Sequence, residues 1–250
     1  MNLSTYIINL EKDIERKNYV SRVLSPYVEN LLRVKWIKAV EGKKLTEKEL
    51  DSVFDRSLAF KRYGRYLNLG EIGCVLSHFK CYKALIESSD EYALVLEDDI
   101  TILKKLYWTN EMHETLQTEE PVILFLSGDY WFTKIIKKGD INIASVYDAV
   151  GSYAYVINRA AAQLILKKNT KTSFVSDNWS LYRNQGVTLK AIYPYMIDAN
   201  IEDFVSSVRQ EYWGEIRKNM SLAFVVKSYV NALVKRYLLS KGHFVSKIRK

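Results

Sequence analysis

The sequence contains only two cysteines among its 250 residues, Cys74 and Cys81. They stand seven positions apart in a predicted helix, which separates them by about 10 Å, too far for a disulfide. A chain without a disulfide framework is typical of a reducing compartment. The N-terminus also lacks the basic segment and apolar run of a signal peptide. We therefore expect a cytoplasmic protein that is not exported.

Proline and long apolar runs are also scarce. Only three residues are proline and 48% are apolar, which excludes a largely disordered chain and indicates a substantial core. In the C-terminal region the longest uncharged stretch, residues 219–226, has eight residues and is far too short to span a bilayer.

An excess of basic residues is confined to the C-terminus. Residues 215–250 hold nine Lys or Arg and a single acidic residue, Glu215, whereas residues 1–214 hold 28 of each sign. The net charge of +8 therefore belongs to a tail. We predict a neutral globular domain over residues 1–214 and a basic tail over residues 215–250. The neutral domain disfavours a nucleic-acid partner.

The tail carries apolar residues in steps of three and four, which predicts one apolar helix face. These residues are Leu222, Val225, Val226, Tyr229, Val230, Leu233, Tyr237 and Leu238. One interpretation is a terminal helix packed on the domain with a solvated basic face. The other is an interfacial helix attracted to an anionic membrane surface.

Apolar strand-like segments alternate with amphipathic segments in the domain. Strands are predicted at residues 5–10, 34–40, 93–96, 122–126 and 151–157, and helices from Gly70 to about residue 87 and at residues 159–166. Residues 43–66 show no clear period and are predicted to form helical fragments and loops. This alternation indicates an α/β fold with a largely parallel sheet.

Three consecutive carboxylates, Glu97, Asp98 and Asp99, follow the buried segment 93–96. Ligands of open α/β sheets bind at the carboxyl ends of strands. In extended chain Glu97 and Asp99 project to the same side, so their oxygens can converge on one hard cation. The alternative is a solvated acidic turn.

Several nucleotide and metal motifs are missing. The sequence has no Gly-x-Gly-x-x-Gly segment and no glycine-rich loop ending in Lys-Ser or Lys-Thr. The three histidines and two cysteines have no zinc-site spacing. A nucleotide held through a carboxylate-bound divalent metal remains compatible with the sequence.

Three segments together resemble glycosyltransferase family 25, the bacterial lipooligosaccharide β-galactosyltransferase family related to collagen galactosyltransferases. They are residues 69–78 (LGEIGCVLSH), 93–99 (ALVLEDD) and 151–159 (GSYAYVINR). Asn9 with Arg16, and residues 39–42 (AVEG), support the match, which extends over about residues 4–200 in family order.

The resemblance implies a GT-A-type fold that binds a nucleotide sugar. Glu97-Asp98-Asp99 would be the variant of the family's Asp-x-Asp metal motif. Asp99 would coordinate Mn²⁺ or Mg²⁺, and Glu97 or Asp98 would contribute to the metal or to the donor. A metal would neutralise the charge that the nucleoside diphosphate gains as the glycosidic bond breaks.

Further donor-binding residues follow from the same resemblance: Asn9, Arg16, Ser77, His78, Gly151 and Ser152. Three of them have a structural alternative. Arg16 would otherwise be a helix-surface charge, His78 a hydrogen-bonding helix residue, and Gly151 a packing glycine.

An inverting transfer needs a carboxylate base to take the proton of the acceptor hydroxyl. Asp177 aligns with a family aspartate and is the first candidate, although it would also suit the N-cap of a helix over residues 178–184. Asp129, after the segment 122–126, is the second candidate. Sugar platforms are expected among the aromatic residues that follow these segments, which would otherwise belong to the core: Tyr130, Trp131, Trp179 and Tyr182.

These observations predict a metal-dependent inverting glycosyltransferase that moves a hexose, galactose from UDP-galactose, to a lipid-linked lipooligosaccharide acceptor. The basic tail would act as a peripheral anchor on the cytoplasmic face of the inner membrane. The alternatives are UDP-glucose or UDP-N-acetylglucosamine as donor, and a catalytically inactive carbohydrate- or membrane-binding module.

Overall fold

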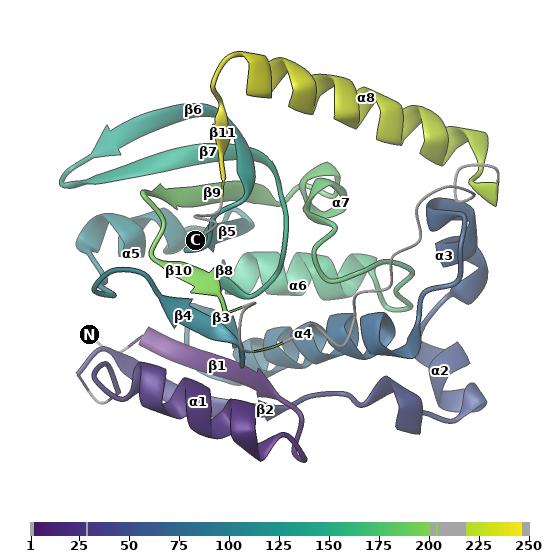
Figure 1. Ribbon diagram of the computed structural model, residues 1–250, viewed down its shortest axis with the longest axis horizontal. Coiled ribbons are helices and arrows are strands. Elements are labelled where there is room, and N and C mark those ends of the chain that lie inside the picture. Colours follow the sequence, from purple (N-terminus) through teal and green to yellow (C-terminus); the bar gives the residue numbers. More distant parts are fainter. Residues whose placement is uncertain (1–2, 29, 201–203, 205–218, 247–250) are drawn as a thin grey trace.

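The computed structural model describes residues 3–28, 30–200, 204 and 219–246, and it is organised around a nine-stranded sheet (Figure 1). The strand order is β11-β6-β7-β9-β5-β8-β3-β1-β2. The strands are β1 (Leu3–Asn9), β2 (Leu32–Lys38), β3 (Tyr92–Glu97), β5 (Val122–Phe125), β6 (Tyr130–Lys138), β7 (Ile141–Ala149), β8 (Ala154–Asn158), β9 (Thr188–Tyr193) and β11 (Phe244–Val245). Two short strands, β4 (Ile100–Ile102) and β10 (Ile197–Ala199), pair separately.

The sheet is mixed but has a dominant direction. Parallel pairings join β1 to β2, β1 to β3 and β5 to β9, and its other pairings are antiparallel. Along these pairings β1, β2, β3, β5, β6 and β9 run one way, and β7, β8 and β11 run the other. The predicted α/β fold with a mostly parallel sheet is confirmed.

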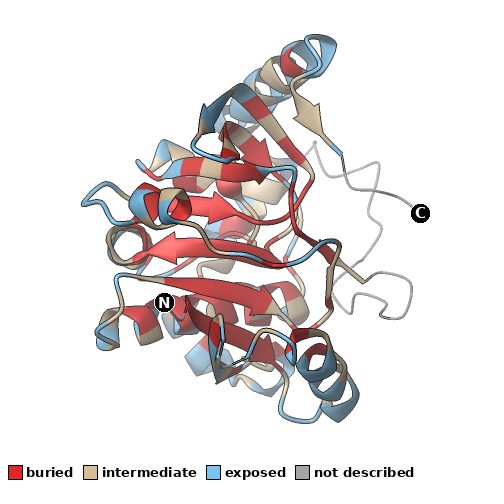
Figure 2. Cartoon of the chain, turned by 90° about the vertical axis from the view of Figure 1, so that its left-hand side faces the viewer, coloured by how far each residue is buried: buried red, intermediate tan, exposed pale blue. Residues whose placement is uncertain are grey.

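Helices cover both faces of the sheet, because its central strands are apolar on both sides. One core lies between the sheet and α4 and α6, and a second core lies on the opposite face beside α1 and α5. Figure 2 shows the buried strands running through the centre of the molecule. The helices are α1 (Ile14–Leu24), η1 (Gly42–Lys44), α2 (Glu47–Val53), α3 (Arg56–Tyr63), α4 (Leu69–Glu87), α5 (Asn110–Leu116), α6 (Arg159–Lys168), α7 (Trp179–Asn184) and α8 (Leu222–Ser240).

Helix α4 is the best-defined element of the sequence and begins where a capping box closes its first turn. The Asn68 side chain accepts from the Glu71 backbone N–H, and the Glu71 side chain accepts from the Asn68 N–H. The helix packs directly against the segment after β2, since a Cβ on Gly73 would lie 2.4 Å from the Val40 carbonyl oxygen. Glycine at this position therefore brings α4 close to the sheet.

The predicted strands and helices of the domain mostly agree with the structure within a few residues at their ends. The elements β4, α5, β9 and β10 were not predicted, and two further segments differ. The predicted strand at residues 151–157 begins only at Ala154, because residues 151–153 form the loop before β8. The hairpin β6–β7 was not predicted, because residues 130–149 show no regular alternation and its pairing is interrupted at Trp131, Phe132 and Lys134.

The tail forms helix α8 and strand β11, which pairs with β6 (Figure 1, yellow). The predicted boundary between domain and tail, at residues 214 and 215, lies outside the described residues. Helix α8 is held on the domain by Asp148 of β7, which accepts hydrogen bonds from Asn231 and Lys235, both at 2.9 Å. Among the described helices, none has the length and apolar character needed to cross a membrane.

Candidate active site

The three carboxylates, Glu97, Asp98 and Asp99, lie at the carboxyl end of β3. Glu97 ends β3 and pairs with Ile8 of β1, so the end of β1 lies beside it. Because β8 is antiparallel to β3, the loop before β8 lies on the other side, and the Glu97 N–H donates to the Tyr153 carbonyl at 3.0 Å. One edge of the sheet therefore brings together the carboxyl ends of β1 and β3 and the start of β8.

Asp98 is held by the two residues of the opening segment. The Asn9 amide donates to Asp98 Oδ2 at 2.7 Å, and Arg16 Nη1 donates to Asp98 Oδ1 at 2.9 Å. Arg16 reaches the site from α1, which is capped by Asp13. Burial raises the pKa of Asp98, although these two hydrogen bonds favour its charged form. Arg16 is therefore a site residue and not only a surface charge.

Asp99 has one oxygen available for a ligand. Its Oδ2 accepts from Arg16 Nη1 at 3.2 Å, whereas Oδ1 is buried and has no hydrogen-bond partner among the described residues. Burial, together with the negative charge of Glu97, raises the pKa of Asp99 to about 7. A bound cation would relieve both effects, so the oxygen donors of Asp99 and Glu97 fit Mn²⁺ or Mg²⁺.

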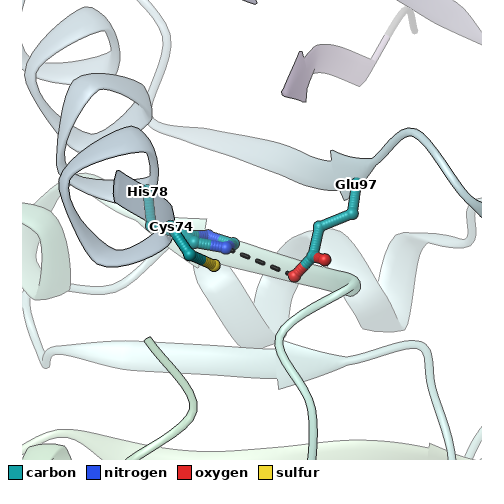
Figure 3. Close-up of side chains that lie close together, drawn as sticks. All are labelled: Cys74, His78 and Glu97. Atoms are coloured by element: carbon teal, nitrogen blue, oxygen red, sulfur yellow. Dashed lines mark ion pairs between the residues drawn. The ribbon is translucent and has the colours of Figure 1, made fainter. Parts of the chain in front are cut away.

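Glu97 is fixed by α4 on one side and by the loop before β8 on the other (Figure 3). His78 Nε2 lies 3.4 Å from Glu97 Oε1, and His78 Nδ1 lies 2.8 Å from the Tyr155 hydroxyl. The Ser152 hydroxyl donates to Glu97 Oε1 at 2.8 Å. Burial would raise the pKa of Glu97, but His78 and then Ser152 outweigh it and lower the pKa. The histidine is buried, with 1% of its surface exposed, so it approaches Glu97 from the protein interior.

Cys74 lies next to this pair, one turn before His78 on α4 (Figure 3). The ligand atoms of Cys74, His78 and Glu97 lie within 4.8 Å of one another. Burial raises the pKa of the thiol, and its sulfur lies 3.2 Å from the Ser176 hydroxyl. This donor set suits Zn²⁺, in contrast to the oxygen donors that Mn²⁺ and Mg²⁺ prefer.

Gly151 connects the site to Asp177. Its N–H donates to Asp177 Oδ2 at 3.1 Å, and its carbonyl accepts from Trp179 Nε1 at 2.8 Å. Gly151 has φ +79°, a left-handed conformation that favours glycine. Burial raises the pKa of Asp177, and the charge of Glu97 adds to the effect. The N-cap of α7 is Asn178, so the alternative role of Asp177 as that cap is wrong.

Asp129 lies beside the same loop but is engaged differently. Its carbonyl accepts from the Val150 N–H at 2.9 Å, and its φ of +60° turns the chain sharply before β6. The carboxylate is half-buried. Both candidate bases therefore flank residues 150–152, and the Asp177 carboxylate accepts a hydrogen bond from the Gly151 N–H.

Comparison with known proteins gives the family. The sequence model of glycosyltransferase family 25 (LPS biosynthesis protein) matches residues 2–179. The chain belongs to glycosyltransferase family 25.

Curated relatives of this family 25 chain match part of its length. Procollagen galactosyltransferase 2 of Homo sapiens is 31% identical over 174 residues, which cover 66% of this chain and 27% of the relative. A glycosyltransferase 25 family member of Aedes aegypti is 36% identical over 98 residues, or 38% of this chain and 16% of the relative. The chain thus matches about a quarter or less of the length of these relatives.

A solved structure of the galactosyltransferase LgtC with donor and acceptor sugar analogues is a distant structural match. It has a TM-score of 0.38 and 9% identity, and the match covers 75% of this chain and 73% of that chain. The family 25 match ends at Trp179, so it includes every candidate site residue but not α8.

Not every predicted residue of the family 25 chain lies in this cluster. The Ser77 hydroxyl donates to the Gly73 carbonyl at 2.6 Å and accepts from the Val40 N–H at 2.8 Å, so it ties α4 to the end of β2. Of the predicted sugar platforms, three are buried in the core: Tyr130, Trp179 and Tyr182. Trp131 is half-buried under Lys235, whose nitrogen lies 4.0 Å from the ring centroid.

Three residues of the cluster were not predicted as site residues: Cys74, Tyr155 and Ser176. The Ser176 hydroxyl lies 3.0 Å from the Ser152 hydroxyl, and Tyr155 links His78 to the Tyr82 hydroxyl at 2.8 Å. Ser176 directly precedes the candidate base Asp177, and Tyr155 lies inside the 151–159 segment that resembles the family. Both residues were therefore close to positions that the sequence analysis singled out. A serine or a tyrosine does not indicate, from sequence alone, that its side chain faces the carboxylate cluster.

Proposed function

We propose that this protein transfers a hexose from a UDP-sugar to a saccharide acceptor with inversion at the sugar C1 carbon. The observation that carries the proposal is the buried Asp99 Oδ1 at the carboxyl end of β3, which lies beside Glu97 and has no hydrogen-bond partner among the residues that the structure describes. Family 25 membership supports the reaction class. The galactosyltransferase names of the relatives support galactose as the sugar.

The donor side of the site consists of residues that orient the carboxylates. Asn9 and Arg16 hold Asp98, while Ser152 and His78 hold Glu97. Asp99 and Glu97 would hold Mn²⁺ or Mg²⁺, which when bound supplies positive charge to the departing diphosphate. The left-handed Gly151 leaves the start of β8 free of a side chain, which allows a close approach of the donor.

Asp177 is proposed as the general base. A carboxylate base works best when its pKa approaches the working pH, and burial raises the pKa of Asp177. The base would accept the proton of the acceptor hydroxyl as that hydroxyl attacks C1 of the donor sugar. Asp129 is the second candidate, because it lies on the other side of residues 150–152.

The acceptor is proposed to be a lipid-linked oligosaccharide at the cytoplasmic face of the inner membrane. Helix α8 supports this, because large apolar side chains on its outer side are 45–79% exposed: Leu222, Val226, Tyr229, Val230, Leu233 and Tyr237. Two basic residues of the same helix, Lys227 and Arg236, are also exposed, and Lys227 lies at the side of the helix that borders the domain. An exposed apolar helix face with basic residues is typical of a helix that lies in an anionic membrane interface.

The test is UDP release from three donors, UDP-galactose, UDP-glucose and UDP-N-acetylglucosamine, by the full chain with Mn²⁺. Even without an acceptor, slow hydrolysis of the correct donor is expected to exceed that of the others. Release from UDP-galactose above the other two supports the proposal. Equal background release from all three, with no binding of UDP, would favour a binding module without catalysis.

A further inference from the structure

A cavity of about 530 Å³ lies between α8 and the domain, apart from the carboxylate cluster. Its walls come from α3, β7, α7 and α8, which are brought together when α8 packs across the upper end of the molecule in Figure 1. The cavity depends on α8 and is therefore formed partly by the segment outside the family 25 match.

The charged residues that line this cavity are all basic. They are Arg62 of α3, Arg183 of α7 and Lys227 of α8, and none of the described residues that line the cavity is acidic. No ion pair within 4.0 Å joins any of the three to a described carboxylate. Three cations around one cavity repel one another, so an anion bound there would be stabilised.

Arg62 is a half-buried residue of the cavity wall. Its guanidinium lies between the rings of Phe174 and Phe224, 5.6 Å and 5.0 Å from their centroids, and donates to the Ser173 hydroxyl at 3.4 Å. Its Nε is buried and has no hydrogen-bond partner among the described residues. Burial also lowers the pKa of Arg62, because it disfavours the charged form. An anionic ligand would restore the missing partner.

Arg183 is preorganised on the opposite wall. Its guanidinium lies 3.8 Å from the Tyr147 ring centroid and donates to the Tyr147 carbonyl. The next residue, Asp148, is the nearest described acid of β7, and Lys235 already pairs with it at 2.9 Å. The negative charge of Asp148 is therefore used to fix α8 and does not neutralise Arg183.

The cavity shares a wall with the proposed general base. Tyr63 and Asn178 both line it, and the Tyr63 hydroxyl accepts hydrogen bonds from the Asn178 amide at 2.9 Å and the Val175 N–H at 3.2 Å. Asp177 stands between Val175 and Asn178 in the chain and faces Gly151.

We propose that this cavity binds the anionic group, a carboxylate or a phosphate, of the carbohydrate acceptor. Arg62 and Arg183 would donate charge-assisted hydrogen bonds to that group, and Lys227 would add a third positive charge. The inference rests on the proposed transferase function and deepens it by naming the acceptor as an acidic saccharide.

The test is an NMR titration of the full chain with glucuronic acid, glucose 6-phosphate, glucose and inorganic phosphate, read at the arginine Nε–H signals. The titration is run with and without saturating UDP and Mn²⁺, so that sugar binding at the donor site can be distinguished from sugar binding in the cavity. The variants are Arg62→Gln and Lys227→Glu, and Lys167→Gln at an exposed position of α6 is the matched control. Thermal unfolding checks that each variant folds. Because Lys227 is exposed, Lys227→Glu is expected to fold and still tests the cavity if Arg62→Gln does not fold.

Both acidic sugars are expected to bind, with dissociation constants raised at least tenfold by either variant and unchanged by Lys167→Gln. Binding of glucose as strong as that of glucose 6-phosphate would overturn the proposal, as would insensitivity to both variants or no binding at all. Inorganic phosphate binding as tightly as glucose 6-phosphate would also overturn it, because the cavity would then not recognise a saccharide. Failure of UDP to bind the wild-type chain would contradict the transferase function instead. The two variants measure acidic-sugar binding at the cavity, and this measurement does not depend on UDP binding.

Discussion

The Ser152 hydroxyl donates a hydrogen bond to Glu97 Oε1 at 2.8 Å, joining two residues that are 55 positions apart in the chain. His78, on α4, approaches the same carboxylate oxygen at 3.4 Å. Residues from the three segments that carry the family resemblance, 69–78, 93–99 and 151–159, therefore meet at the Glu97 side chain. The neighbouring Asp99 has a buried oxygen, Oδ1, with no hydrogen-bond partner in the described part of the chain.

The first prediction concerns the pH dependence of stability. The pKa of Asp99 rises from an ordinary value of 3.8 to about 7 in the folded protein, through burial and the charge of Glu97. Its contribution to stability is therefore fully present below pH 3.8 and is lost as the pH rises through 7. Without metal, wild type should lose more stability than Asp99→Asn between pH 5 and pH 8, measured by thermal unfolding.

Metal adds a second readout to the same comparison. A carboxylate ligand must be deprotonated, so Mn²⁺ should stabilise wild type more at pH 8 than at pH 5. Asp99→Asn should show little Mn²⁺ effect at either pH. Equal Mn²⁺ stabilisation of the two proteins at pH 8 would remove Asp99 from the metal site.

The second prediction separates the two candidate bases. Asp177→Asn should lower kcat by roughly 10²–10⁴-fold, the usual contribution of general base catalysis, and leave UDP affinity nearly unchanged. Asp129→Asn should reduce kcat far less, because we assign proton transfer to the Asp177 carboxylate, which accepts from the Gly151 N–H. Steady-state kinetics with UDP-galactose decide between them, and the reverse order of effects would make Asp129 the base.

The third prediction assigns Ser77 a structural role. Its hydroxyl is 1% exposed and accepts from the Val40 N–H at 2.8 Å. Ser77→Ala removes this partner and should destabilise the fold by about 1–3 kcal/mol. Urea unfolding measures the change, and Ser52→Ala on the exposed face of α2 is the control. Unchanged stability with weakened UDP binding would return Ser77 to the donor site.

The sequence was most informative where a buried strand or a long helix has a strong local signal. The 93–96 run and the apolar face of α4 predicted β3 and the helix that covers it, because both depend on burial of consecutive or periodic apolar residues. Asp98 and Asp99 followed from their position after that strand. Register then explains why Asn9, which ends β1, lies beside them.

Other features depend on contacts that no local pattern records. The hairpin β6–β7 has an interrupted register, so its alternation is weak. The N-cap of α7 is Asn178, although Asp177 is an equally good cap by residue type, because Gly151 engages the Asp177 carboxylate. The basic cavity requires α3, α7 and α8 to meet, and these helices are more than 100 residues apart at their extremes.

The fourth prediction concerns α8 and membranes. Tyr229→Ser with Leu233→Ser should abolish most flotation with vesicles that contain anionic phosphatidylglycerol, because both residues are exposed apolar side chains of α8. Neutral phosphatidylcholine vesicles should bind wild type weakly. The matched control is Ile136→Ser with Tyr193→Ser, two residues of similar exposure outside α8. Equal flotation of both double variants would contradict the membrane role of α8.

The most direct test of the whole account is a calorimetric titration of UDP into the full chain, with Mn²⁺ and then with EDTA. Asp99→Ala is measured beside Asp140→Ala, an exposed aspartate in the turn between β6 and β7. The account predicts UDP binding to wild type and Asp140→Ala only when Mn²⁺ is present, and at least tenfold weaker binding to Asp99→Ala. UDP binding that ignores both EDTA and the loss of Asp99 would contradict the nucleotide-sugar site proposed at the end of β3.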